Sequence, residues 1–122
     1  MISRPLIILL FALMSNLLLA QADPYIYVLG VVQDAGYPQA GCYQAHCLPA
    51  WENAELRRGA TSIAAVDPVA NSKYLFEATP HLPEQLYNLE RVAPDKRYSL
   101  EGIFLTHAHI GHYTGLMFFG FE

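Results

Sequence analysis

The sequence predicts an α+β fold, in which the strands of a β-sheet are flanked by a few short helices. The run Gly-Ile-Phe-Leu at 102–105 has the β-branched and aromatic content of a buried strand. Two more β-forming runs, 62–66 and 74–78, bracket a turn-rich segment and predict a hairpin. Leucines at helical spacing, beginning at Leu82, predict a helix over 84–91.

The first 22 residues predict a secretory signal peptide. Arg4 precedes an apolar run, and Ala20-Gln21-Ala22 places small residues around a cleavage position. We therefore expect cleavage before Asp23 and export of the mature chain, 23–122, to the periplasm or beyond the cell. An uncleaved membrane anchor is the alternative, although the run is marginal against the roughly 20 apolar residues of a spanning helix.

The mature chain is expected to be acidic. Loss of Arg4 lowers the basic residues from seven to six against eleven acidic ones, so the net charge is −5. Nucleic-acid binding depends on clustered Lys and Arg side chains, so we expect no nucleic-acid partner and no membrane contact beyond the signal segment. The remaining residues suffice for one domain, and a small-molecule substrate is the expected ligand.

Three elements are expected in the first half of the mature chain. The β-forming run 25–32 predicts a strand, and the glycines and proline of 33–41 predict a loop. Pro49 suits the first turn of a helix over 49–58, with Gly59 as its stop. Trp51 is expected to anchor this helix on the sheet.

Three histidines follow the strand at 102–105 within six residues: His107, His109 and His112. If the strand continues through His109, side-chain alternation places the first two imidazoles on one face. Gly111 then allows a sharp turn that returns His112 toward them. Histidines bonded to the backbone are the alternative, but three imidazoles would compete for few acceptors. The cluster therefore favours a metal site.

This stretch resembles a known motif. The strand followed by Thr-His-Ala-His-Ile-Gly-His resembles the first metal-binding motif, HxHxDH, of the metallo-β-lactamase fold. Residues 28–30, 74–77 and 78–80 resemble its N-terminal half. Gly36-Tyr37-Pro38-Gln39 before a cysteine most resembles proteins similar to pyrroloquinoline-quinone biosynthesis protein B. The resemblance implies the N-terminal half of an αββα sandwich, with a mixed β-sheet and flanking helices, over 23–122.

The sequence departs from the motif in two ways. Gly111 stands where the family has an Asp that ligates the second metal, so we expect one tightly bound ion, zinc or iron. His107 and His109 would hold it, and His112 would bind a second ion weakly or donate a hydrogen bond. The family's later ligands and the cover for the apolar run 116–121 are lacking. We therefore expect a missing C-terminal half or a second chain.

The resemblance also implies roles for three other side chains. Asp34 lies in the loop that, in the family, reaches the mouth of the site. It would support the metal region or contact the substrate, or else it is a simple turn residue. Glu77 would orient a metal-binding imidazole, or else be an acid on an edge strand facing water. His81 stands where relatives often have Asp, and we expect it to start a helix rather than bind a metal.

Two cysteines, Cys42 and Cys47, flank His46. An exported chain favours a disulfide between them. The alternative is a structural zinc site formed by the three residues, since related proteins carry a cysteine-rich metal site in this region. The spacing alone does not decide between the two.

Together these features predict an exported metallo-hydrolase that uses a metal-activated water on an ester, lactone, amide or phosphodiester. A metal-dependent oxidoreductase or cofactor-biosynthesis enzyme is one alternative, suggested by the nearer relatives. A non-catalytic metal-binding fragment is the other, because the motif lacks its Asp.

Overall fold

The computed structural model describes residues 22–120. The predicted signal peptide, apart from Ala22, lies outside the described residues, as do Phe121 and Glu122. Within residues 22–120, no helix has the length and apolar character needed to cross a bilayer.

Four strands form one mixed sheet in the order β1-β2-β3-β4. The pairs β1–β2 and β2–β3 are antiparallel, whereas β3 and β4 are parallel. A parallel pair needs a crossover, and α3 supplies it. The predicted α+β class with a mixed sheet is therefore confirmed. The elements are β1 (Tyr25–Gly30), β2 (Ser62–Asp67), β3 (Ser72–Phe76), α3 (Leu82–Val92) and β4 (Ser99–Phe104).

The predicted hairpin connects β2 and β3. Oδ1 of Asp67 accepts hydrogen bonds from the backbone N–H groups of Val69 (2.8 Å) and Ala70 (3.1 Å). Asn71 takes the left-handed conformation, with φ 53°, that its short polar side chain tolerates. The turn chemistry at the end of β2 therefore fixes the hairpin register.

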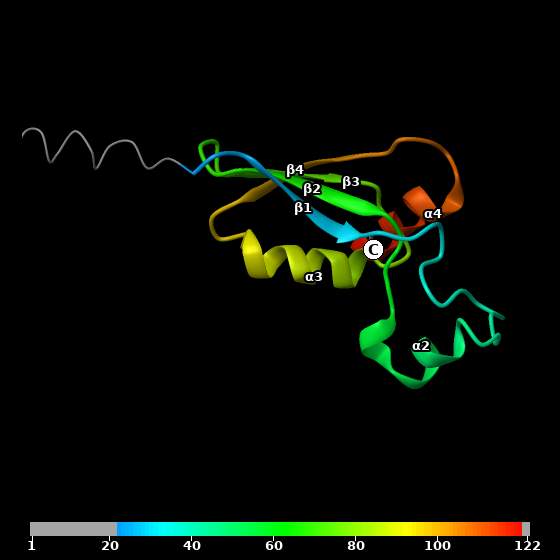
Figure 1. Ribbon diagram of the computed structural model, residues 1–122. Helices are drawn as coiled ribbons and strands as arrows, with labels where there is room; N and C mark the ends of the chain where they lie inside the picture. The colour runs from blue at the N-terminus through cyan, green and yellow to red at the C-terminus, as the bar shows by residue number, and fades with distance from the viewer. Residues whose placement is uncertain (1–21, 121–122) are drawn as a thin grey trace, which may run out of the picture.

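Helix α3 lies against one face of the sheet (Figure 1). The helix begins with a proline in its first turn, a position where the missing N–H costs nothing. Its buried leucines, Leu82 and Leu89, pack with residues of β2 and β3. The buried core consists of Ala64, Val66, Leu75, Ala78, Leu82, Leu89, Ala93 and Tyr98.

The opposite face of the sheet is also apolar. Cross-strand register aligns Val28, Ile63, Phe76 and Phe104 in one row, and the Phe76 and Phe104 rings stack at 5.3 Å. No described helix covers this row, and Val28 and Phe104 are 57% and 52% exposed. The sheet therefore carries apolar side chains on both of its faces.

Two predictions for the 49–58 region are wrong. Instead of one helix there are α2 (Leu48–Glu52) and a 3₁₀ turn, Ala54–Leu56, because Asn53 is extended and its side chain accepts from Glu55 N at 2.9 Å. Trp51 does not anchor the helix on the sheet. Its indole N–H donates to the Cys42 carbonyl at 2.7 Å, so it holds the cysteine loop.

The strand that precedes the histidines is shorter than predicted. β4 ends at Phe104, so His107 and His109 lie in a loop rather than on one face of a strand. After this loop come α4 (Ile110–Tyr113) and a 3₁₀ helix, Thr114–Phe119.

Candidate metal centre

Backbone hydrogen bonds hold the histidine segment against the residues that follow β3. Glu77 N–H donates to the Phe104 carbonyl at 2.9 Å, and Ala78 N–H donates to the His112 carbonyl at 2.8 Å. Gly115 N–H returns a bond to the Ala78 carbonyl, also at 2.8 Å. The start of α4 is thereby fixed beside the ends of β3 and β4, where the two parallel strands terminate together (Figure 1).

The three predicted metal-binding histidines converge there. His107 Nε2 lies 3.0 Å from His109 Nδ1, and the His107 and His112 ring centroids are 4.0 Å apart. His107 is the member that contacts both others, and Thr106 Oγ1 lies 2.9 Å from its Nδ1. His107 and His109 are exposed. The loop thus brings the imidazoles together without the strand geometry that was expected.

Glu77 is a buried residue next to the histidine cluster. It is 4% exposed, and its Oε1 accepts a hydrogen bond from Thr106 N–H at 3.0 Å. Its Oε2 lies 3.0 Å from His112 Nδ1 but is not aligned with it as a hydrogen bond; in residues 22–120 neither atom has another partner. Glu77 lies just past the end of β3, with φ +76°. It is therefore not an acid on an edge strand that faces water, which was the alternative role expected for it.

Asp34 reaches the same histidine from the other side. Its Oδ1 lies 2.8 Å from His112 Nε2, so both nitrogens of the imidazole face carboxylates. The loop after β1 delivers this side chain through a turn in which Ala35 and Gly36 have φ 72° and 78°.

A cleft of about 460 Å³ opens beside this cluster. Three of its lining residues are the predicted His109, His112 and Asp34. The sequence predicted no site role for the other three, which are Gln33, Gln39 and Thr61. Thr61 joins them because residues around Ala60 bridge to Val32, a pairing that leaves no local sequence signal.

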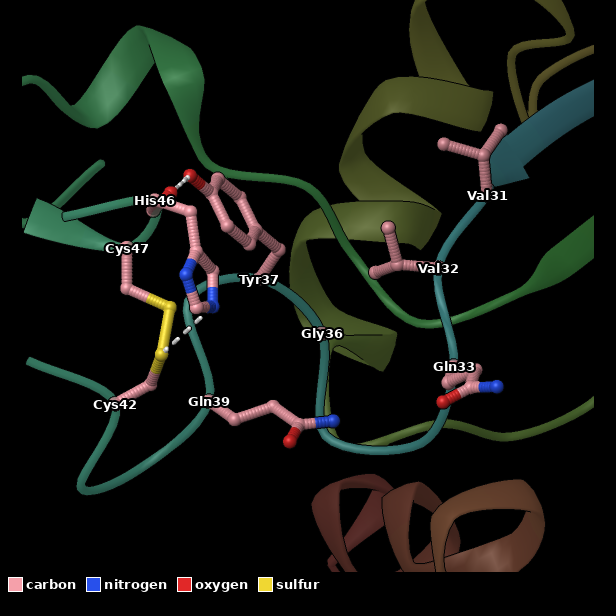
Figure 2. Close-up of a pocket in the computed structure, with 9 residues that line it drawn as sticks. All are labelled: Val31, Val32, Gln33, Gly36, Tyr37, Gln39, Cys42, His46 and Cys47. Carbon is pink, nitrogen blue, oxygen red and sulfur yellow. Dashed lines mark hydrogen bonds between the residues drawn. A yellow bond between two sulfur atoms is a disulfide. The ribbon is translucent and has the colours of Figure 1, made fainter. Parts of the chain in front are cut away.

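The two cysteines form a disulfide, the first of the two arrangements considered for them. They line a second cleft, of about 400 Å³, in the loop after β1 (Figure 2). His46 points at the disulfide, with Nε2 3.6 Å from Cys42 Sγ. Donor atoms of these three residues lie within 4.8 Å of one another, but the S–S bond leaves no thiolate to bind a metal.

His81 caps the N-terminus of α3, as expected of a residue that starts the helix. Its Nδ1 accepts a hydrogen bond from Ala60 N–H at 3.3 Å. It therefore ties the start of α3 to the segment that precedes β2, and it does not line the histidine cleft.

The sequence matches no protein-family model and no curated protein. Among solved structures, the chain is similar to zinc-bound PqqB from Methylobacterium extorquens, with a TM-score of 0.62 and 24% identity over 77% of this chain and 35% of that one. It is also similar to a diphosphatase from the PhnP family, with a TM-score of 0.58 and 27% identity over 76% of this chain and 33% of that one. The chain has a metallo-β-lactamase-like fold. It spans about a third of the length of either structure.

The metallo-β-lactamase-like fold bears on the chemistry of the histidine cluster. The PqqB structure contains zinc, so metal binding occurs among proteins of this fold. In the present chain, the exposed imidazoles, the buried Glu77 carboxylate and the Asp34 carboxylate all meet where β3 and β4 end.

Proposed function

We propose that this chain forms part of an exported metal-dependent hydrolase that cleaves an ester, lactone, amide or phosphodiester. The observation that carries the proposal is the cluster of three histidines and two carboxylates in a metallo-β-lactamase-like fold, beside a cleft that His109, His112 and Asp34 line. Export is supported by the apolar leader and its small-residue cleavage position.

The residues present fit a divalent metal ion. His107 and His109 are exposed imidazoles with nitrogens 3.0 Å apart, which suits neutral donors that converge on one ion. Behind them, Glu77 Oε2 and His112 Nδ1 are buried polar atoms without a hydrogen bond among the described residues. Such a carboxylate behind an imidazole is a recurrent support for metal-binding histidines.

Each group then has a part in the reaction. His107 and His109 would hold the ion beside the cleft, and Glu77 would supply a carboxylate 3.0 Å from Nδ1 of the His112 ring. When bound, zinc supplies Lewis acidity and lowers the pKa of water toward about 7, which provides a nucleophile at neutral pH. The side chains of Gln33 and Gln39 line the cleft and offer amide groups to a polar substrate.

Phosphoester substrates are the class to test first. One of the similar structures is a diphosphatase, and the cleft is lined by amide, hydroxyl, imidazole and carboxylate groups rather than large apolar side chains. Esters and lactones follow, since the same chemistry would cleave them.

The test is metal-dependent hydrolysis by the full-length protein. A panel of activated phosphodiesters, esters and lactones would be assayed before chelation, after chelation and after zinc is restored. We expect activity that chelation abolishes, that zinc restores, and that falls at least about 100-fold in His107→Ala, with loss of a metal ligand. His46→Ala, in the disulfide loop, is the matched control and should retain activity. Hydrolysis that survives chelation or the His107 substitution would refute the proposal.

A further inference from the structure

The backbone at Gly111 leaves no room for a side chain. A Cβ built there would lie 2.6 Å from Asp34 Cγ, 2.8 Å from Asp34 Cβ and 3.0 Å from Asp34 Oδ1. The two carbon contacts are shorter than non-bonded carbon atoms approach, and the contact with Oδ1 is also tight. The volume that a side chain at position 111 would fill is therefore filled by Asp34, which comes from the loop after β1.

The carboxylate of Asp34 is directed at the metal centre. Its Oδ1 lies 2.8 Å from His112 Nε2 and shares the cleft with His109. The two sides of the His112 ring differ in burial. The Glu77 side chain behind Nδ1 is 6% exposed, whereas the Asp34 side chain in front of Nε2 is 45% exposed. Nε2 and Oδ1 are thus the pair that a solvent-borne ion can reach.

We propose that Asp34 is a metal ligand, and that with His112 it forms a second cation position beside the one at His107 and His109. The loop after β1 would then supply the carboxylate that the histidine motif lacks at position 111, and the site would hold two ions instead of the one expected from the sequence. This inference rests on the proposed function, since it adds a ligand to the same site. The expected ion is a divalent cation that accepts mixed nitrogen and oxygen donors, with zinc as the probe.

The donor geometry suits this role with a small adjustment. Two donors bound to one tetrahedral zinc ion at about 2.1 Å lie about 3.4 Å apart. The Asp34 Oδ1 to His112 Nε2 distance of 2.8 Å is shorter by a few tenths of an ångström. Because Asp34 is a half-exposed loop residue, its side chain can withdraw by this amount. Glu77, held by Thr106 N–H, keeps the ring in place while it does so.

The same 2.8 Å contact also suits a proton between the two atoms, which would make Asp34 only a hydrogen-bond partner of His112. The two roles differ in the number of metal ions bound. They also differ in what happens when the carboxylate is moved from position 34 to position 111.

The experiment measures zinc bound per chain by native mass spectrometry, on full-length protein equilibrated with zinc after chelation. Cobalt absorption spectra provide a second readout that does not depend on activity. We expect two equivalents in the wild type and one in Asp34→Asn, which preserves the size and hydrogen-bonding capacity of the side chain. The exchange variant Asp34→Gly/Gly111→Asp should bind two again, because it restores a carboxylate to the same volume.

The outcomes separate this inference from the proposed function. One equivalent in the wild type that is lost in His107→Ala would overturn the role of Asp34 and leave the hydrolase proposal intact. Two equivalents that persist in Asp34→Asn would also overturn it. No bound zinc in a folded wild type would refute both. Circular dichroism of the exchange variant shows whether it folds, and Asp34→Asn decides the question if it does not.

Discussion

Glu77 controls the geometry of the histidine cluster through both of its carboxylate oxygens. Oε1 accepts from Thr106 N–H at 3.0 Å and so fixes the loop that carries His107. Oε2 lies 3.0 Å from His112 Nδ1. A single buried side chain thus contacts both the loop that carries His107 and the ring of His112, although its own backbone has the disfavoured φ of +76°.

Replacement of Glu77 by Gln should lower zinc affinity about 10- to 100-fold, the range typical of groups that orient metal-binding histidines. The amide keeps an oxygen for Thr106 N–H but removes the negative charge beside His112. Zinc titration monitored by calorimetry would measure the loss. Glu101→Gln, at an exposed position of β4, is the control. Equal affinities in the two variants would contradict the role given to Glu77.

The sequence could identify the histidines because their density in six residues has no easy structural explanation. It could not identify the coupling of Asp34 with Gly111. These residues lie far apart in the chain, and their contact depends on the path of the loop after β1. In the sequence, Gly111 looks like the loss of a metal-binding Asp. In the structure, the absence of a side chain at Gly111 leaves the volume that the Asp34 side chain occupies.

Helix α3 is joined to the sheet by a buried polar network as well as by its leucines. The Gln85 amide donates to the Ala60 carbonyl at 2.8 Å and accepts from Thr79 Oγ1 at 2.7 Å. Gln85 is 2% exposed. Because these partners are buried too, the network must remain complete for the fold to be stable.

Gln85→Leu should destabilise the protein by about 1–3 kcal/mol, the cost of leaving a buried polar partner unsatisfied. Asn88→Leu, on the exposed side of the same helix, should change stability by less than about 0.5 kcal/mol. Urea denaturation of both variants would measure the difference. A Gln85 variant as stable as the Asn88 variant would show that the network is dispensable.

The disulfide closes a loop of only six residues, Cys42 to Cys47. The chain-entropy relation gives it about 2 kcal/mol of stabilisation. Alkylation of the natively oxidised protein without reductant should add no mass, and reduction should add two alkyl groups. Two alkylated thiols before reduction would contradict the disulfide and reopen the zinc alternative for His46 and the two cysteines.

Sequence patterns predicted the hairpin and the long helix but not where the shorter helices and β4 end. Alternation and turn residues predicted the β2–β3 hairpin, and leucine spacing predicted α3. The helix expected over 49–58 is broken because Asn53 caps a new turn, a local competition that helix periodicity does not reveal. β4 ends early because the histidine loop bonds to the segment after β3 instead of continuing the sheet.

Within residues 22–120, no helix covers the second apolar face of the sheet. The row formed by Val28, Ile63, Phe76 and Phe104, at the ends of β3 and β4, has the composition of a sandwich interior. The similar solved structures are about three times as long as the matched region. We propose that a second half of the fold, or a second chain, supplies a layer that covers this face.

Two valines of similar exposure allow a direct test. Val28 is 57% exposed on the apolar face, and Val69 is 52% exposed in the hairpin turn. If a layer covers the face, Val28→Asp should destabilise the full-length protein by on the order of 3–5 kcal/mol, the cost of an uncompensated buried charge. Val69→Asp should cost less than about 0.5 kcal/mol. Equal effects in chemical denaturation would mean that the face remains open.

The most direct test of the central claim is the zinc content of the full-length protein and its variants after equilibrium dialysis. We predict bound zinc in the wild type, a loss of at least one equivalent in the His107→Ala/His109→Ala double variant, and no loss in His46→Ala. Unchanged zinc in the double variant, or loss of zinc in His46→Ala alone, would place the metal at the cysteine loop and contradict the account.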